Sequence, residues 1–93
     1  MGYNLLVEKD LNKKLIRRLK IIEGQIRGLQ RMVSDNKYCI DIITQTSAVK
    51  RSLSSIEDAI LENHLDTCAT KQMAAGNASK ARKEILHVYK LKR

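Results

Sequence analysis

Apolar residues recur at intervals of three and four over most of this chain, the spacing that places them on one face of an α-helix. The pattern holds over residues 10–33, 37–71 and 78–91, which we predict to be three helices. Two short groups of turn-forming residues separate these segments: Ser-Asp-Asn at 34–36 and Ala-Gly-Asn at 75–77. The sequence therefore predicts an all-α fold with three helices per chain.

The first predicted helix has two opposite faces. At about 100° per residue, one stripe collects its apolar side chains: Leu11, Leu15, Leu19, Ile22, Ile26, Leu29 and Val33. The opposite stripe collects cations: Lys13, Arg17, Lys20, Arg27 and Arg31. Because like charges one turn apart repel each other, such a row is favoured when something anionic meets it. A solvated face that binds nothing is the alternative interpretation.

The second and third helices each carry an apolar face. The second is long enough to be the central packing element, with apolar residues at Ile42, Val49, Leu53, Ile56 and Ile60. The third is shorter, and its inward face consists of Ala78, Ala81, Ile85 and Val88. Because 93 residues are too few for two cores of ordinary size, we expect one domain spanning residues 1–93.

The composition indicates a polyanionic partner and an oligomeric assembly. Lys and Arg number 18 against 10 Asp and Glu, a net charge of +8 that favours a polyanionic partner such as nucleic acid. Residues 1–51 hold 11 cations and 5 anions, so a polyanion is expected mainly against the first half. The chain has no Phe, Trp or Pro. Since large rings usually anchor a small core, we expect the missing burial to come from oligomerisation.

Several classes of protein are not expected. No apolar stretch is long enough to span a membrane, and charge appears by residue 8, so the prediction is a cytoplasmic protein. In that reducing compartment, two cysteines are expected to be ligands or redox sensors rather than a disulfide. An enzyme is not expected, because no Ser/His/Asp arrangement, Gly-rich phosphate loop or inward pair of carboxylates can be placed.

Two cysteines and one histidine form a candidate metal site. His64 and Cys68 are four residues apart, which on a helix suits two ligands of one metal. Cys39 lies about 37 Å from His64 along a helix and cannot join them within one chain. Two antiparallel copies of the second helix would bring Cys39 of one chain to the other pair. Two thiolates and one imidazole suit Cu(I) or Zn(II). Two buried cysteines and a capping histidine are the alternative.

The order and spacing of three segments resemble a known family. They are RLKIIEGQIRGLQRMV at 18–33, YCIDIITQTSAV at 38–49 and HLDTC at 64–68. They are similar to the copper-sensitive operon repressor family, small all-helical bacterial transcription repressors, over nearly the whole chain. The resemblance implies a disc-like homotetramer with D2 symmetry, built from two antiparallel helical dimers.

The resemblance also implies a site and a function. Cys39, His64 and Cys68 would bind Cu(I) across a dimer interface, one ion per protomer bridging two chains. Tyr38 and Glu84 would support the ligand histidine by bonding to the free nitrogen of its imidazole. The metal-free protein would bind operator DNA and release it on Cu(I) binding, which would derepress genes for copper export or buffering.

The basic face of the first helix is expected to contact DNA phosphates, with specificity coming largely from operator shape and a few base contacts. The expected contact residues are Lys13, Lys14, Arg17, Arg18 and Arg31, with Lys50 and Arg51 as additions. Arg18 lies about 140° from the centre of the basic stripe. It is included only because it matches the family's Arg-Leu-Lys segment.

Other effectors occur among relatives in this family. The nickel and cobalt branch adds a histidine near the N-terminus, where this chain has Leu6, Val7 and Glu8. The formaldehyde branch uses an N-terminal proline and the persulfide branch lacks the histidine, whereas this chain has His64 and no proline. Zn(II) binding stays chemically open. A helical copper chaperone or buffer is a further alternative, with positive charge serving solubility.

Overall fold

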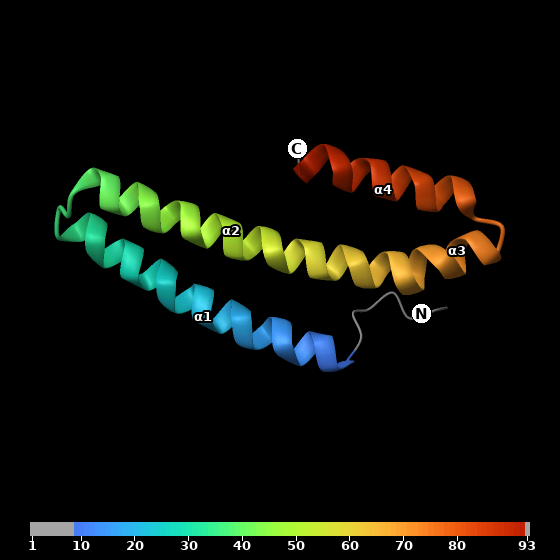
Figure 1. The fold of residues 1–93 in the computed structure, drawn as a ribbon, viewed down its shortest axis with the longest axis horizontal. Helices are drawn as coiled ribbons and strands as arrows, with labels where there is room; N and C mark the ends of the chain where they lie inside the picture. The colour runs from blue at the N-terminus through green and yellow to red at the C-terminus, as the bar shows by residue number, and fades with distance from the viewer. Residues whose placement is uncertain (1–8, 93) are drawn as a thin grey trace. The chain divides into compact units, whose positions relative to one another are not determined.

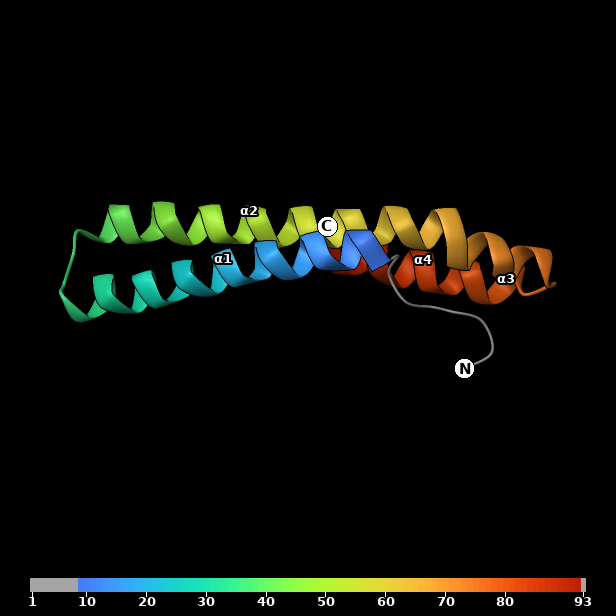
Figure 2. The same cartoon turned by 90° about the horizontal axis from the view of Figure 1, so that it is seen from below.

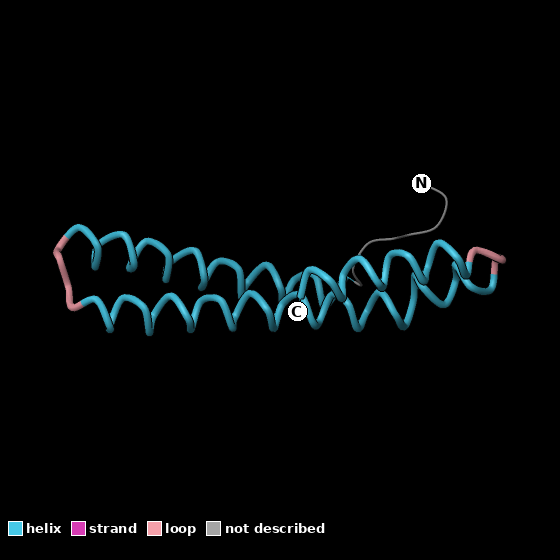
Figure 3. The backbone as a smooth tube through the Cα atoms, turned by 90° about the horizontal axis from the view of Figure 1, so that it is seen from above, coloured by secondary structure: helices cyan, strands magenta, loops and turns pink. Residues whose placement is uncertain are grey.

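The computed structural model describes residues 9–92, which form helices in the order expected for an all-α chain (Figure 1). The elements are α1 (Lys9–Ser34), α2 (Cys39–His64), the π-helical turn η1 (Leu65–Ala69), α3 (Thr70–Ala74) and α4 (Ala78–Lys92). No strand occurs in this range. The predicted all-α class is confirmed. The second predicted helix differs from the expectation, because it is interrupted by a π-turn and continues to Ala74. Figure 3 shows α2, η1 and α3 following one another without a loop.

Two compact units divide the described chain, one ending at Ile60 and the other beginning at Leu61. The first, here called the α1–α2 unit, holds α1 and most of α2. The second, here called the C-terminal unit, holds the end of α2 with η1, α3 and α4. None of the helices in residues 9–92 combines the length and the apolar character needed to cross a membrane.

In the α1–α2 unit, two long helices run antiparallel and pack along one apolar seam (Figures 1 and 2). The buried side chains of this seam are Leu15, Ile22, Val49 and Ile56, with Leu11, Leu29 and Ala59 packed against them. On each helix the two buried residues are seven positions apart, which is two helical turns. The seam is therefore the narrow contact that two helices make when no third helix packs against them.

The turn between α1 and α2 is a Schellman motif, which confirms the predicted helix end at residues 34–36. Asn36 has a positive φ of 54°, a conformation that asparagine tolerates better than most residues. The Asn36 N–H bonds to the carbonyl of Val33 at 3.1 Å, and the Lys37 N–H bonds to that of Met32 at 3.0 Å. These two bonds satisfy the last carbonyls of α1 and reverse the chain direction.

The predicted apolar stripe of α1 is wider than the surface that α2 covers. Leu15 and Ile22 are buried, whereas Leu19 and Ile26 are each 43% exposed and Val33 is 60% exposed. Within a single chain, the predicted stripe is therefore only partly buried. On α2, Leu53 and Ile60 are likewise exposed. Both helices therefore carry a second apolar strip that the α1–α2 unit does not bury.

The C-terminal unit is built around small and polar side chains. Its buried residues are Cys68, Gln72 and Ala81, each at most 1% exposed. Of the predicted inward face of α4, Ala81 is buried, Ile85 and Val88 are half-buried, and Ala78 is exposed. α4 packs against α3 within this unit.

The predicted stop at residues 75–77 is a second Schellman motif, which ends α3. Gly76 has a φ of 85°. The Gly76 N–H bonds to the carbonyl of Met73 at 3.1 Å, and the Asn77 N–H bonds to that of Gln72 at 2.7 Å. Glycine adopts this left-handed conformation without steric cost, so the chain reverses here and begins α4.

Candidate functional site

The predicted pair His64 and Cys68 lies at the π-helical turn of the C-terminal unit. His64 ends α2 and is half-buried, and Cys68 is the fourth residue of η1 and is 1% exposed. π-turns are rare in proteins and occur frequently at functional sites. The structure therefore places both candidate ligands on a locally irregular stretch of helix rather than on a plain α-helix.

Threonine hydroxyls hold the backbone around this turn. Thr67 Oγ1 donates to the carbonyl of Asn63 at 2.7 Å, and Thr70 Oγ1 donates to the carbonyl of Leu65 at 2.9 Å. Thr67 Oγ1 is also 3.5 Å from the Sγ of Cys68. Side-chain bonds of this kind compete with the regular helical ladder and bend helices. Sequence reasoning missed the π-turn; two threonines flanking Cys68 were the available signal.

The third candidate ligand, Cys39, is the first residue of α2 and is an exposed free thiol. Because Cys39 and His64 begin and end a helix of 26 residues, helical rise separates them by about 37 Å. Within residues 9–92 of a single chain, no three His, Cys, Asp or Glu side chains come together as a metal site. His64 and Cys68 thus lie four residues apart at one end of α2, and Cys39 lies at the other end.

The two predicted supporting residues have different surroundings. Tyr38 immediately precedes α2 and its side chain is 67% exposed. Its backbone carbonyl accepts the N–H groups of Asp41 at 3.0 Å and Ile42 at 3.2 Å, which starts the helix. Glu84 lies on α4, in the same unit as His64 and Cys68. The structure therefore gives Tyr38 a helix-initiating role and leaves Glu84 on the element that packs against α3.

Glu84 has a partner that sequence reasoning did not identify. Gln72 Nε2 donates to Glu84 Oε1 at 3.0 Å, across the contact between α3 and α4. Gln72 is 1% exposed, and its Oε1 is buried without a hydrogen-bond partner. A buried acceptor left unpaired costs about 1–3 kcal/mol. The signal that could have found Gln72 is its position four residues after Cys68, which repeats the spacing between His64 and Cys68.

The predicted DNA-binding face of α1 is open to solvent. The five cations of its basic stripe are all exposed. Three of the four further residues assigned to DNA contact are exposed as well: Lys14, Lys50 and Arg51. Glu23 forms a 3.8 Å ion pair with Arg27, with both side chains more than half exposed. Exposed pairs of this type contribute little stability, so the face keeps its positive character.

Arg18 lies apart from this basic face. It is half-buried, and its Nη2 donates to the Oγ of Ser55 on α2 at 2.7 Å. Its azimuth, about 140° from the basic stripe, already placed it beside the apolar seam. The structure therefore shows Arg18 linking α1 to α2.

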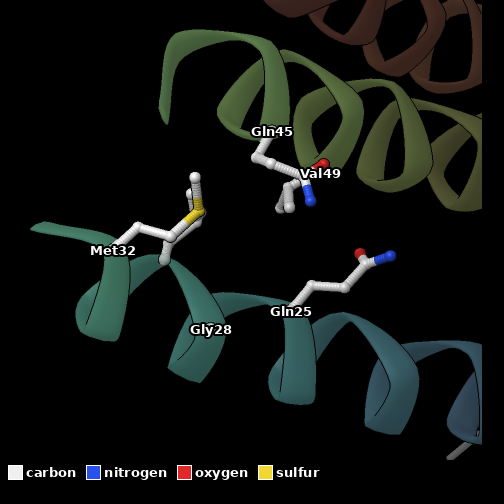
Figure 4. A pocket seen from close by; sticks show the side chains of 6 residues that line it. Gln25, Gly28, Met32, Gln45 and Val49 are labelled. Atoms are coloured by element: carbon white, nitrogen blue, oxygen red, sulfur yellow. The ribbon is translucent and has the colours of Figure 1, made fainter. Parts of the chain in front are cut away.

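A pocket of about 240 Å³ opens between α1 and α2 near the turn that joins them. Gln25 and Met32 extend toward it from α1, and Gln45 and Val49 extend toward it from α2 (Figure 4). Gly28 and Leu29 complete its lining. The lining combines apolar surface with two amides and contains neither a charged nor a thiol side chain.

The sequence matches a described protein family over most of its length. Residues 11–90 match the family described as metal-sensitive transcriptional repressors. The chain is 40% identical over 83 residues to the copper-sensing transcriptional repressor CsoR of Bacillus subtilis, covering 89% of this chain and 79% of that protein. It is 47% identical over 60 residues to the copper-sensing transcriptional repressor RicR of Mycobacterium tuberculosis, covering 64% of this chain and 62% of that protein.

Two solved structures have a fold similar to that of this chain. The copper-sensing repressor CsoR with Cu(I) from Geobacillus thermodenitrificans superposes with a TM-score of 0.84 at 34% identity, covering 98% of this chain and 97% of that one. The nickel-responsive regulator InrS superposes with a TM-score of 0.71 at 30% identity, covering 97% of each chain. The residues where nickel and cobalt sensors were expected to add a histidine, 6–8, lie outside the described part of this structure.

Proposed function

The chain belongs to the metal-sensitive transcriptional repressor family, and from this premise we propose that it is a Cu(I)-responsive repressor. The metal-free protein binds operator DNA and releases it when Cu(I) binds, which derepresses genes for copper export or buffering. The family consists of repressors rather than enzymes. The observation that carries the proposal is a donor set suited to Cu(I) in a chain 40% identical to a copper-sensing repressor over 89% of its length.

Cys39, His64 and Cys68 are the proposed ligands, one ion per protomer bridging two chains. Two thiolates and one imidazole form a soft donor set, which Cu(I) accepts at low coordination number. Two features of the described chain support ligands from two copies. Cys39 is exposed at one end of a 26-residue helix, and His64 stands at the other. A second chain packed antiparallel supplies the missing cysteine to each site.

The assembly proposed for residues 1–93 is one metal-sensing and DNA-binding domain that forms a D2 homotetramer in the cytoplasm. The exposed apolar strips on α1 and α2 support association with further copies, since a neighbouring chain would bury Leu19, Ile26 and Val33. Burial of this kind is what a small domain without large aromatic core residues needs for stability.

DNA binding is assigned to the exposed cations of α1, with Lys50 and Arg51 from α2. Contacts from such cations to phosphates supply salt-dependent affinity and fix the register on the duplex, while operator shape supplies most of the specificity. Arg18 is bonded to Ser55, so its proposed share in DNA contact requires its guanidinium to leave that partner. Exposed Lys13 and Arg17 require no such rearrangement.

Copper and operator binding are negatively coupled in this scheme. By linkage, the factor by which Cu(I) weakens operator affinity equals the factor by which the operator weakens Cu(I) affinity. Tyr38 and Glu84 are proposed to support the imidazole of His64, since a ligating histidine usually donates its second N–H to an outer partner. Gln72 of α3, the helix that follows this turn, bonds to Glu84 of α4.

The direct test measures operator affinity by fluorescence anisotropy, with and without anaerobic Cu(I). We expect Cu(I) to weaken operator binding of the wild type by about 5- to 150-fold and to leave His64→Ala unaffected. His87→Ala, which removes an exposed histidine of α4, is the matched control and retains the response. An unchanged wild-type affinity would overturn the proposal. A copper buffer or chaperone would instead show no salt-dependent affinity for duplex DNA.

A mixing experiment tests whether ligands come from two chains. Neither Cys39→Ser nor Cys68→Ser has an intact site as a homodimer. A mixed dimer regenerates one site, because the unchanged Cys39 of one chain meets the unchanged Cys68 of the other. X-ray absorption of the mixture is expected to recover the shell of two sulfurs and one nitrogen that we expect for the wild type. Failure to recover it after refolding the chains together contradicts the bridged site.

A further inference from the structure

The buried face of the C-terminal unit carries a polar side chain directly after the candidate ligands. His64, Cys68 and Gln72 follow one another at intervals of four, and Cys68 and Gln72 are each 1% exposed. In the described residues, Gln72 is the one polar or charged side chain that is buried. Cys68 and Gln72 therefore share the inward side of the chain at η1 and α3.

Gln72 joins α3 to α4 through both its backbone and its side chain. Its carbonyl accepts the N–H of Asn77 at 2.7 Å, which closes the turn before α4. Its Nε2 donates to Glu84 Oε1 at 3.0 Å, one turn beyond the fully buried Ala81 of α4. Any shift of Gln72 thus acts on α4 at two points. Gln72 lies three residues beyond the π-turn that holds Cys68.

Packing alone does not account for an amide at this position. Gln72 Oε1 is buried without a partner, and a methionine would fill a similar volume without burying an unpaired acceptor. The bond from Nε2 to Glu84 is the interaction that a methionine would not make. The property that distinguishes Gln72 from an apolar residue is therefore its hydrogen bond to the Glu84 carboxylate.

We infer that Gln72 is a positioning residue that fixes Glu84 through one carboxylate oxygen, so that the other can accept the free N–H of His64 when the imidazole binds an effector. This inference rests on the proposed function. A ligating histidine generally requires such an acceptor, and outer partners of this kind tune metal affinity. Through Gln72 and Glu84, effector binding at the turn from His64 to Cys68 is transmitted to α4.

The first test examines the metal-free assembled protein by NMR. The side-chain NH₂ of Gln72 is expected to exchange slowly with solvent and to lose this protection in Glu84→Ala. Glu62→Ala removes an exposed carboxylate of the same unit and is the matched control, expected to leave the signal unchanged. Equal, fast exchange in all three proteins would overturn the positioning role, because the amide would then not be held by Glu84.

The second test is a double-mutant cycle on the copper response, the ratio of operator Kd values with and without Cu(I). Gln72→Met and Glu84→Ala are each expected to reduce this ratio by about fivefold, and the double variant to lose no more than either alone. Gln72→Met is expected to melt at or above the wild-type temperature, which separates positioning from stability. If Gln72→Met folds poorly, Glu84→Ala, which changes an exposed residue, still tests the hold on the Gln72 amide by NMR.

The outcomes separate this inference from the function on which it rests. A wild type that ignores Cu(I) overturns the proposed function and the inference with it. A wild type that responds, together with a Gln72→Met variant that responds equally, overturns the inference alone. Additive losses in the double variant also overturn it, since Gln72 would then act independently of Glu84.

Discussion

The α1–α2 unit and the C-terminal unit are built on different principles. In the first, long helices meet along a regular seam of aliphatic side chains, and the remaining faces are exposed and basic or apolar. In the second, a π-turn, a buried glutamine and a buried cysteine take the place of an aliphatic seam. Regular apolar packing suits a scaffold that presents surfaces, whereas an irregular polar turn suits a site whose arrangement changes on binding an effector.

The largest expected change in stability comes from a substitution in the apolar seam between α1 and α2. Ile22→Ala removes a side chain that is 5% exposed and is expected to lower the free energy of unfolding by about 2–5 kcal/mol. Ile21→Ala is the matched control on the neighbouring position, 59% exposed, and should cost less than about 1 kcal/mol. Urea denaturation measures both. Equal losses would show that α1 does not bury the face described here.

Two glycine-to-alanine substitutions are expected to change stability by smaller amounts and in opposite directions. One lies in a turn of the C-terminal unit and the other in a helix of the α1–α2 unit. Gly76→Ala puts a side chain on a residue with φ of 85°, at a conformational cost of about 1–2 kcal/mol. Gly24→Ala lies within α1, where an added Cβ meets nothing closer than Arg27 Nη2 at 3.8 Å. This variant should gain about 0.5–1 kcal/mol from higher helix propensity. Thermal melts that moved in the same direction would contradict the two assignments.

The smallest expected effect is on the salt dependence of operator binding, which reports the face that contacts DNA. Arg17→Ala should lower the slope of operator affinity against salt by about one, which amounts to roughly 3.5-fold over a fourfold change in salt. Lys83→Ala removes an exposed cation from the C-terminal unit and serves as the control with an unchanged slope. Anisotropy titrations at several salt concentrations measure both. A loss of slope in Lys83→Ala alone would move the DNA-binding face from α1 to α4.

Much of the fold could be predicted from residue patterns because helices and their ends are local structures. The predicted ends at residues 34–36 and 75–77 hold because Asn36 and Gly76 adopt the left-handed conformation that closes a helix. From their spacing of four residues, His64 and Cys68 are predicted to be ligands of one metal. The assignment of Cys39, His64 and Cys68 to one metal stays a prediction, since it depends on a second chain.

What the sequence could not decide was which neighbour each side chain meets. Leu15 and Leu19 belong to the same apolar stripe, yet only Leu15 is buried, because a single helix covers a narrower surface than the stripe offers. The π-turn at Cys68 accompanies threonine hydrogen bonds that compete with the regular helical ladder. The bond between Gln72 and Glu84 depends on α4 packing against α3. Periodicity alone determined helices, their ends and their polar faces. Tertiary packing decided burial and the partner of Glu84, because these depend on residues distant in the chain.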